Sequence, residues 1–221
     1  MKYTNNIILP IILTISVISG AVTFTVFFTP LYYFDVKALD IPGQSGYSTD
    51  LIYRNYNTLI NYMSVFNRGE LSFPDLAMSA TGKIHFEEVK NIFVIFQILL
   101  PSTAAVAIPW SIYIYRKKHS TMFFRISGII TLALPVFLGI WSAVNFDSLF
   151  TSFHKVAFRN DYWLFYPEED PIINILPEDY FMHAFILIAV IVIGMGILFL
   201  FLGRGRSKIS KRKSKKAIKQ N

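Results

Sequence analysis

Four long apolar stretches constrain the fold of this chain more than any other feature. They cover residues 7–29, 89–115, 122–145 and 181–202, and a helix of roughly 20 residues is enough to cross the hydrocarbon core of a membrane. Lipid does not tolerate unpaired backbone groups, so we expect each stretch to be a helix. Charged residues make up only 16% of the chain, against roughly 25% in soluble domains. The sequence therefore predicts an all-α membrane protein with a bundle of four transmembrane helices in a single domain, residues 1–221.

The charges between the apolar stretches are segregated by sign. All 14 acidic residues fall within two segments, 30–88 and 146–180, whereas basic clusters occupy the turn at 116–125 and the tail at 203–221. Cytoplasmic loops of membrane proteins carry an excess of Lys and Arg. We therefore expect a multi-pass protein of the cell membrane whose N- and C-termini are cytoplasmic. The two acidic segments then form a small extracellular cap, in which short strands are one option for residues 71–81.

The basic tail predicts a partner as well as an orientation. A basic run beside a membrane is attracted to anionic lipid headgroups, so we expect the tail to contact membrane lipid and expect no nucleic-acid partner. The chain has no cysteine, which excludes a thiolate metal site and a cysteine nucleophile. Any catalysis must use other side chains.

The cap carries one clear amphipathic pattern. Apolar and aromatic residues in LIYRNYNTLINYMSVF, residues 51–66, recur at helical spacing, with Asp50 as the expected N-cap. This helix is expected to lie on the membrane, where it either packs the cap or contacts substrate. The second apolar helix is expected to start near Lys83, and residues 168–170 are expected to form a solvated turn.

The four histidines differ in their expected surroundings. His119 lies in the basic turn and His183 just inside the fourth apolar stretch, whereas His85 and His154 border the cap at similar depth. A metal site from His85, Glu88 and His154 lacks diagnostic spacing, and the chain has no GxSxG, HExxH or Gly-rich phosphate motif. Acid–base chemistry by His85 and His154 is the remaining hypothesis.

Two motifs resemble a known family. IHFEEVKNIF at the entry to the second apolar stretch and FHKVAFRNDYWLFYPEEDPIINILPEDYF before the fourth resemble the lipoprotein intramolecular transacylases, four-span proteins of Gram-positive bacteria. The resemblance implies that His85 and His154 are catalytic and that Glu88 replaces an aspartate of the family pattern. It implies an acyltransferase that moves the sn-2 acyl chain of a diacylglyceryl-cysteine lipoprotein to the cysteine α-amino group. The product is the lyso-form lipoprotein, and no cofactor or metal is expected.

Several side chains near the two histidines are candidates for substrate binding. Glu88 or Asp161 is expected to orient an imidazole, and Lys90 or Asn160 to steady the ester oxygen. Each also has a structural interpretation, as a turn cap or as part of an aromatic belt at the membrane interface. The expected aromatic walls of the pocket are Phe153, Phe158, Trp163 and Tyr166.

Two other functions stay open from the residues alone. A non-enzymatic membrane scaffold or chaperone would use the cap to bind a partner, and its histidines would matter only for folding. A lipid ester hydrolase would release free fatty acid. Both differ from a transacylase in the products that they leave.

Overall fold

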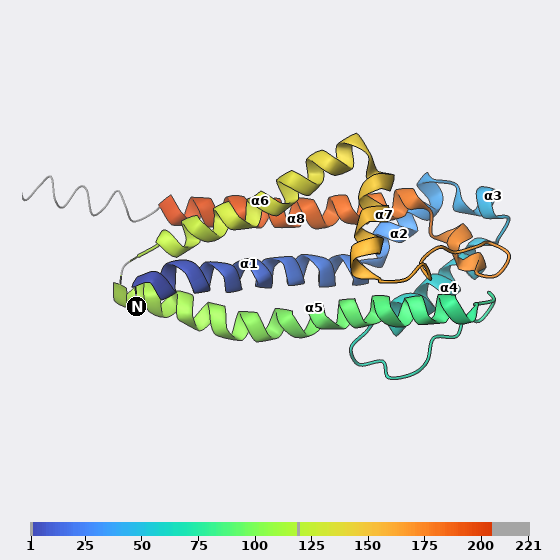
Figure 1. The fold of residues 1–221 in the computed structure, drawn as a ribbon, viewed down its shortest axis with the longest axis horizontal. Helices are drawn as coiled ribbons and strands as arrows, with labels where there is room; N and C mark the ends of the chain where they lie inside the picture. The colour runs from blue at the N-terminus through green and yellow to red at the C-terminus, as the bar shows by residue number, and fades with distance from the viewer. Residues whose placement is uncertain (1, 119, 205–221) are drawn as a thin grey trace, which may run out of the picture. The chain divides into compact units, whose positions relative to one another are not determined.

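The computed structural model of this protein describes residues 2–118 and 120–204. Across these residues the chain is helical, with no strand, and residues 71–79 form coil and bends. Four of the described helices contain a segment long and apolar enough to cross a membrane (Figure 1). These are α1 (Lys2–Phe27), α5 (Ala80–Tyr113), α6 (Met122–Val144) and α8 (Glu178–Arg204).

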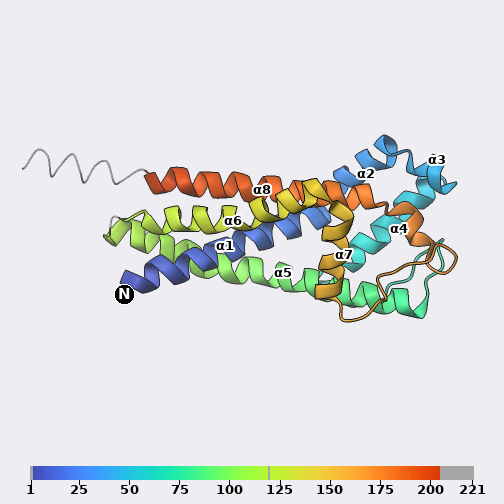
Figure 2. The same cartoon turned by 45° about the horizontal axis from the view of Figure 1, so that its top comes forward.

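Shorter helices connect them. They are α2 (Thr29–Ala38), α3 (Ile41–Ser45), α4 (Thr49–Tyr62), the π-helical turn η1 (Ile114–Lys118), α7 (Phe146–Ala157) and the 3-10 helix η2 (Pro171–Ile175). Figure 2 shows the same elements from a second direction. The chain divides into two compact units. The first unit contains residues 1–21, 99–137 and 189–221, and the second unit contains residues 22–98 and 138–188.

Close helix packing organises the described part of the first unit. A Cβ atom added to Gly128 on α6 would lie 2.8 Å from the carbonyl oxygen of Gly196 on α8, so the backbones approach too closely there for any side chain at Gly128. Thr14 and Thr131 share a buried hydrogen bond of 2.9 Å between their hydroxyls. Small residues and buried hydroxyl pairs are typical of contacts between membrane helices.

The second unit has a core of tyrosines. The rings of Tyr32 and Tyr56 stack with centroids 3.6 Å apart, and Tyr180 meets Tyr32 edge-on at 5.1 Å. The Tyr32 hydroxyl donates to the carbonyl of Ile175 at 2.7 Å, and the hydroxyls of Tyr56 and Tyr180 are 3.0 Å apart. Buried tyrosines normally find such partners. This core joins α2, α4, η2 and the start of α8.

Helix α4 belongs to that core. Its residues Ile52, Tyr56 and Leu59 are buried, which favours the packing interpretation of its amphipathic pattern. The expected N-cap Asp50 was wrong by two positions, because the Ser48 side chain accepts the hydrogen bond from the Leu51 N–H. Ser48 has the extended backbone that an N-cap needs, whereas Asp50 already lies inside the helix.

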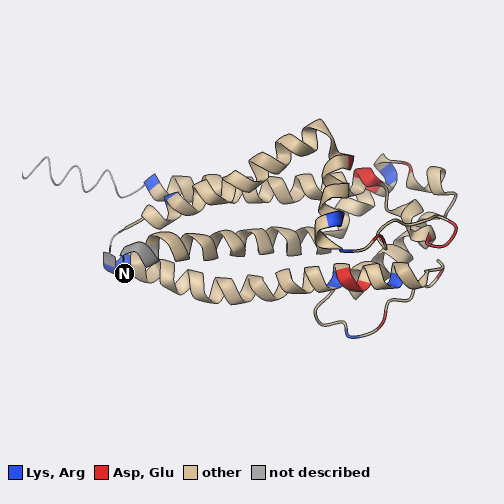
Figure 3. Cartoon of the chain, in the orientation of Figure 1, with Lys and Arg blue, Asp and Glu red and all other residues tan. Residues whose placement is uncertain are grey.

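Charge follows the division into units. Figure 3 colours the acidic residues red, and all of them belong to the second unit. Much of the basic tail, residues 205–221, lies outside the described residues, so its expected contact with lipid headgroups stays a prediction.

Candidate active site

The start of α5 is held by a residue from a distant part of the chain. Ser79 precedes the helix, and its hydroxyl accepts a hydrogen bond from the Gly82 N–H at 2.9 Å, as an N-cap does. The carboxylate of Asp170 in turn accepts from the Ser79 N–H at 2.8 Å and from the Ser79 hydroxyl at 2.6 Å. Ser79 and Asp170 are 91 positions apart. The second cap segment therefore fixes the end of the helix that carries His85.

This arrangement corrects the expected solvated turn at residues 168–170. Glu168 and Glu169 are exposed, but Asp170 is only 3% exposed. A buried carboxylate needs hydrogen-bond donors, and Ser79 supplies two of them. The helix also starts at Ala80 rather than near Lys83, because the cap lies further upstream than expected.

Gly82→Ala is expected to disturb this contact. A Cβ atom at Gly82 would lie 2.3 Å from Oδ1 of Asp170, so the carboxylate would have to leave Ser79. We expect a lower unfolding midpoint in detergent. In an Asp170→Ala background, Gly82→Ala should lower the unfolding midpoint much less. The effects of two substitutions on stability are not additive when the two residues are in contact. Equal shifts in both backgrounds would contradict the contact.

His85 lies in the second turn of α5 and is buried among aromatic rings. It is 5% exposed. Its ring centroid is 4.7 Å from that of Phe158 and 5.4 Å from that of Phe165. Its Nδ1 atom is buried and has no hydrogen-bond partner among the residues that the structure describes. Buried polar atoms are normally paired, so an unpaired ring nitrogen is a feature to be explained.

His154 lies on α7, a helix whose N-cap Asn145 accepts from the Ser148 N–H. Its Nδ1 is 2.7 Å from the carbonyl oxygen of Phe150. A carbonyl can only accept, so Nδ1 carries the hydrogen and the neutral ring has a free lone pair on Nε2. Burial lowers the pKa of His154 below its ordinary value, partly offset by this hydrogen bond, so the neutral form is favoured.

The two imidazoles face each other within the second unit. Their ring centroids are 6.0 Å apart and their planes are inclined by 35°, so the two rings are close neighbours although they lie on different helices. Phe158 contacts both rings, at 4.7 Å from His85 and 5.5 Å from His154, and Trp163 lies 4.9 Å from His154. The two imidazoles therefore share one aromatic enclosure.

Glu88 and Asn160 form a second link between α5 and the loop after α7. The Asn160 side chain donates to Oε1 of Glu88 at 2.9 Å, and the backbone carbonyl of Asn160 accepts from the Trp163 indole at 3.1 Å. The other carboxylate oxygen of Glu88 is buried and has no partner among the described residues. Three of the expected site residues are thus joined to one another.

The remaining expected site residues have different surroundings. Lys90 is engaged elsewhere, since its Nζ donates to the carbonyl of Asn67 at 2.8 Å and lies 3.9 Å above the Tyr62 ring. Phe153 meets His154 edge-on at 5.4 Å but is 54% exposed. Asp161 lines a cavity beside α7. Tyr166 is exposed, and its carbonyl accepts backbone hydrogen bonds from Glu169 and Asp170.

One buried pair was missed by sequence reasoning. Asp35 on α2 is fully buried, and its Oδ1 lies 2.9 Å from Nδ1 of His183 on α8. Burial raises the pKa of Asp35, and the hydrogen bond from His183 opposes that rise. The available signal was an acid directly after the apolar cluster LYYF, because a buried carboxylate requires a partner.

The described residues hold no cluster suited to a metal ion. Within 2–118 and 120–204, no three His, Cys, Asp or Glu side chains are grouped so that they would ligate one. The chemistry that this arrangement offers is proton transfer by two imidazoles inside an aromatic enclosure.

Comparison with known proteins identifies the family and the fold of this chain. The family model described as "Lipoprotein intramolecular transacylase Lit" matches residues 7–181. A solved structure of the membrane-integral lipoprotein intramolecular transacylase Lit from Bacillus cereus is 38% identical, with a TM-score of 0.91, and the match covers 96% of this chain and 98% of that one. Its H85R variant is 39% identical with a TM-score of 0.83, over 97% of this chain and 95% of that one.

A more distant relative matches a shorter part of the chain. An uncharacterised protein of Aquifex aeolicus is 28% identical over 129 residues, which is 58% of this chain and 57% of that protein. The chain thus matches little more than half the length of this relative. Together with the family match over most of its length, the four long helices and the paired histidines, these likenesses show that the chain belongs to the family of lipoprotein intramolecular transacylases.

Proposed function

We propose that this protein moves the sn-2 acyl chain of a diacylglyceryl-cysteine lipoprotein onto the α-amino group of the same cysteine. The observation that carries the proposal is the 6.0 Å separation of the His85 and His154 rings. One ester C–O bond breaks, one amide C–N bond forms, and the amine proton ends on the glyceryl oxygen. Amine and ester carbonyl belong to one molecule and close a ring of about eight members, so correct folding of the substrate supplies much of the rate as effective molarity.

We assign the base to His154. Its Nδ1–H is held by the Phe150 carbonyl, which leaves Nε2 as the acceptor. The substrate α-amino group has an ordinary pKa of roughly 7.7 to 8, so a neutral imidazole can remove its proton during attack on the ester. The same ring, once protonated, can return the proton to the departing glyceryl oxygen.

We assign a hydrogen bond to the substrate to His85. Its Nδ1 lacks a partner among the described residues, and a donor placed opposite the base would stabilise the oxyanion that forms at the ester carbonyl. Asn160 and Glu88 are positioning residues in this proposal, because their hydrogen bond ties the loop that carries Trp163 to α5.

Mass spectrometry of a lipoprotein's N-terminal peptide tests the reaction. Transfer within one molecule leaves the mass unchanged and moves the acyl chain to nitrogen, which fragmentation of the peptide locates. Hydrolysis would remove one fatty acid, and a scaffold would leave the peptide as it was. Purified protein with a diacylglyceryl-cysteine peptide should give the isomer of unchanged mass, and either of the other results would reject the proposal.

The pKa of His154 can be measured directly. Because burial lowers it, the ring should titrate below the ordinary value of about 6.5, and the base should stay neutral into mildly acidic solution. NMR of ring-labelled histidine should place its midpoint below that of a surface histidine, with His154→Gln identifying the signal. The unfolded chain would bind this proton at higher pH, so the contribution of His154 to stability should fall as pH drops below about 6.5. A midpoint at or above 6.5 would contradict the buried, neutral ring.

We also propose that the cap faces the outside of the cell and that both termini are cytoplasmic. The segregation of acidic and basic residues supports this orientation. The chain has no cysteine, so the labelling of a single introduced cysteine shows on which side of the membrane that residue lies. Phe66→Cys, at a position 90% exposed in the cap, should react with a membrane-impermeant maleimide in intact cells. Lys117→Cys, at an exposed position in the basic turn, should react only after the cells are opened, and the reverse pattern would invert the orientation.

A further inference from the structure

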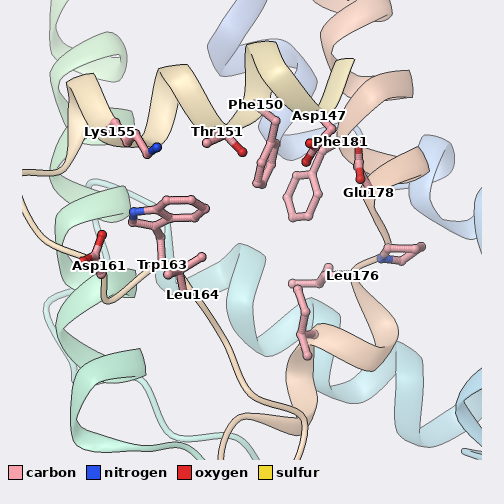
Figure 4. A pocket seen from close by; sticks show the side chains of 12 residues that line it. Asp147, Phe150, Thr151, Lys155, Asp161, Trp163, Leu164, Leu176, Glu178 and Phe181 are labelled. Atoms are coloured by element: carbon pink, nitrogen blue, oxygen red, sulfur yellow. The ribbon is translucent and has the colours of Figure 1, made fainter. Parts of the chain in front are cut away.

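A cavity of about 700 Å³ lies on the second unit, and two of the rings that line it also contact His154. It is bounded by one face of α7, by the loop after α7 and by the segment from η2 to the start of α8 (Figure 4). This volume is within the range of about 300–1,000 Å³ that is usual for ligand sites. The acyl-transfer proposal gives the cavity no role.

The cavity shares its walls with the proposed base. Phe150 and Trp163 line it, and the same two rings contact the His154 imidazole at 4.0 and 4.9 Å. Phe181 continues the wall, 5.5 Å from Phe150. The cavity and the His154 imidazole are therefore neighbours that share two aromatic side chains.

Charged side chains mark the two ends of the cavity. Asp147 and Glu178 lie together at one end in Figure 4, and Lys155 and Asp161 lie at the other. The salt bridges between described residues are Arg54–Asp75, Lys83–Glu70 and His183–Asp35, so none of these four charges is paired. All four side chains are exposed, so the rim of the cavity carries three carboxylates against one ammonium, which favours a basic over an acidic group of a bound molecule.

The substrate has one other part that must be placed. The reacting cysteine is the first residue of a protein, so a peptide chain continues from its carbonyl group and has to leave the site. We propose that this cavity binds the first peptide residues after the modified cysteine, and that Asp147 and Glu178 favour a basic over an acidic side chain there. The inference rests on the proposed function and adds a specificity to the same site.

The geometry of α7 indicates which residue of the substrate peptide would lie beside Asp147. Asp147 and His154 are seven residues apart on α7, which corresponds to about 10.5 Å along a helix at 1.5 Å per residue. An extended peptide covers about 3.3–3.6 Å per residue. The acidic end of the cavity should therefore meet the side chain roughly three residues after the cysteine.

Three synthetic diacylglyceryl-cysteine peptides test this, with Lys, Ser or Glu at the third position after the cysteine. We expect kcat/KM to be about 1.5- to 5-fold higher for the Lys than for the Glu peptide at low salt, the range of exposed ion pairs. The ratio should shrink towards 1 in about 1 M salt. In the double variant D147N/E178Q the Lys-to-Glu ratio should fall to near 1, whereas Glu169→Gln, outside the cavity, should keep the wild-type ratio.

Equal kcat/KM for the Lys and Glu peptides in the unchanged protein would overturn the inference and leave the proposed function intact. A ratio that persists in D147N/E178Q would assign the preference to other residues and would also overturn it. Failure of all three peptides to convert would instead reject the proposed function, and the inference with it.

Discussion

His154→Ala and His85→Ala are each expected to lower the rate of acyl transfer by about 10²- to 10⁴-fold, the usual contribution of a general acid or base. His154→Ala removes the imidazole whose Nδ1 is held by the Phe150 carbonyl, and His85→Ala removes the facing donor. The rate is measured with purified protein and a diacylglyceryl-cysteine peptide under single-turnover conditions.

The effects of the two histidine substitutions on the rate should also be non-additive. If they act on one bound group, the double variant should be about as slow as the slower single variant. Val156→Ala is a matched control on the same helix, at a position that is 83% exposed, and it should keep normal activity. Near-normal rates in both single histidine variants would contradict the acid–base proposal. The unfolding midpoint of each variant shows whether a lower rate reflects loss of the folded protein instead.

Asp170→Ala should produce the largest loss of stability among the single substitutions considered. It leaves the Ser79 N–H and hydroxyl without their buried acceptor. Hydrogen bonds to a charged group contribute about 1.5–3 kcal/mol each, so the loss of these two is expected to cost about 3–6 kcal/mol. The unfolding midpoint in one fixed detergent measures it.

Activity should fall with stability in this variant, because the same contact fixes the first turns of α5 and hence His85. Glu169→Ala removes the exposed carboxylate of the preceding residue and should change neither the unfolding midpoint nor the activity. Asp170→Asn keeps one acceptor oxygen, so its stability and activity should lie between those of Asp170→Ala and Glu169→Ala. If Asp170→Ala unfolds at the wild-type temperature, the cap segment does not hold the helix as described.

Much of the fold follows from local sequence properties. The four long helices could be predicted because apolar runs of this length have few alternatives in lipid. Segments long enough to cross a membrane lie in the described helices α1, α5, α6 and α8. Helix starts were predicted less well, as Ser48 and Ser79 show. An N-cap depends on which nearby polar residue adopts an extended backbone, and that depends on packing as much as on sequence.

The candidate site could be predicted in its residue types and only in part in its geometry. Histidines are few in this chain, so two at the same border of the cap stood out. Lys90 fitted the same pattern, yet its ammonium binds the carbonyl of Asn67 and the Tyr62 ring. Sequence spacing tells which residues share a helix face, but not which neighbour a long side chain reaches.

The sequence by itself determined the number of long helices, the segregation of charge and the residues able to exchange protons, because these depend on composition and on short-range periodicity. Only the tertiary structure decided that the ring centroids of His85 and His154 lie 6.0 Å apart. It also decided that Asp170 holds Ser79, the N-cap of α5, from 91 positions away and that Asp35 pairs with His183. Such contacts join segments that are distant along the chain. They are fixed by how helices pack and by the strong tendency of buried polar groups to find hydrogen-bond partners, and no local sequence pattern specifies either.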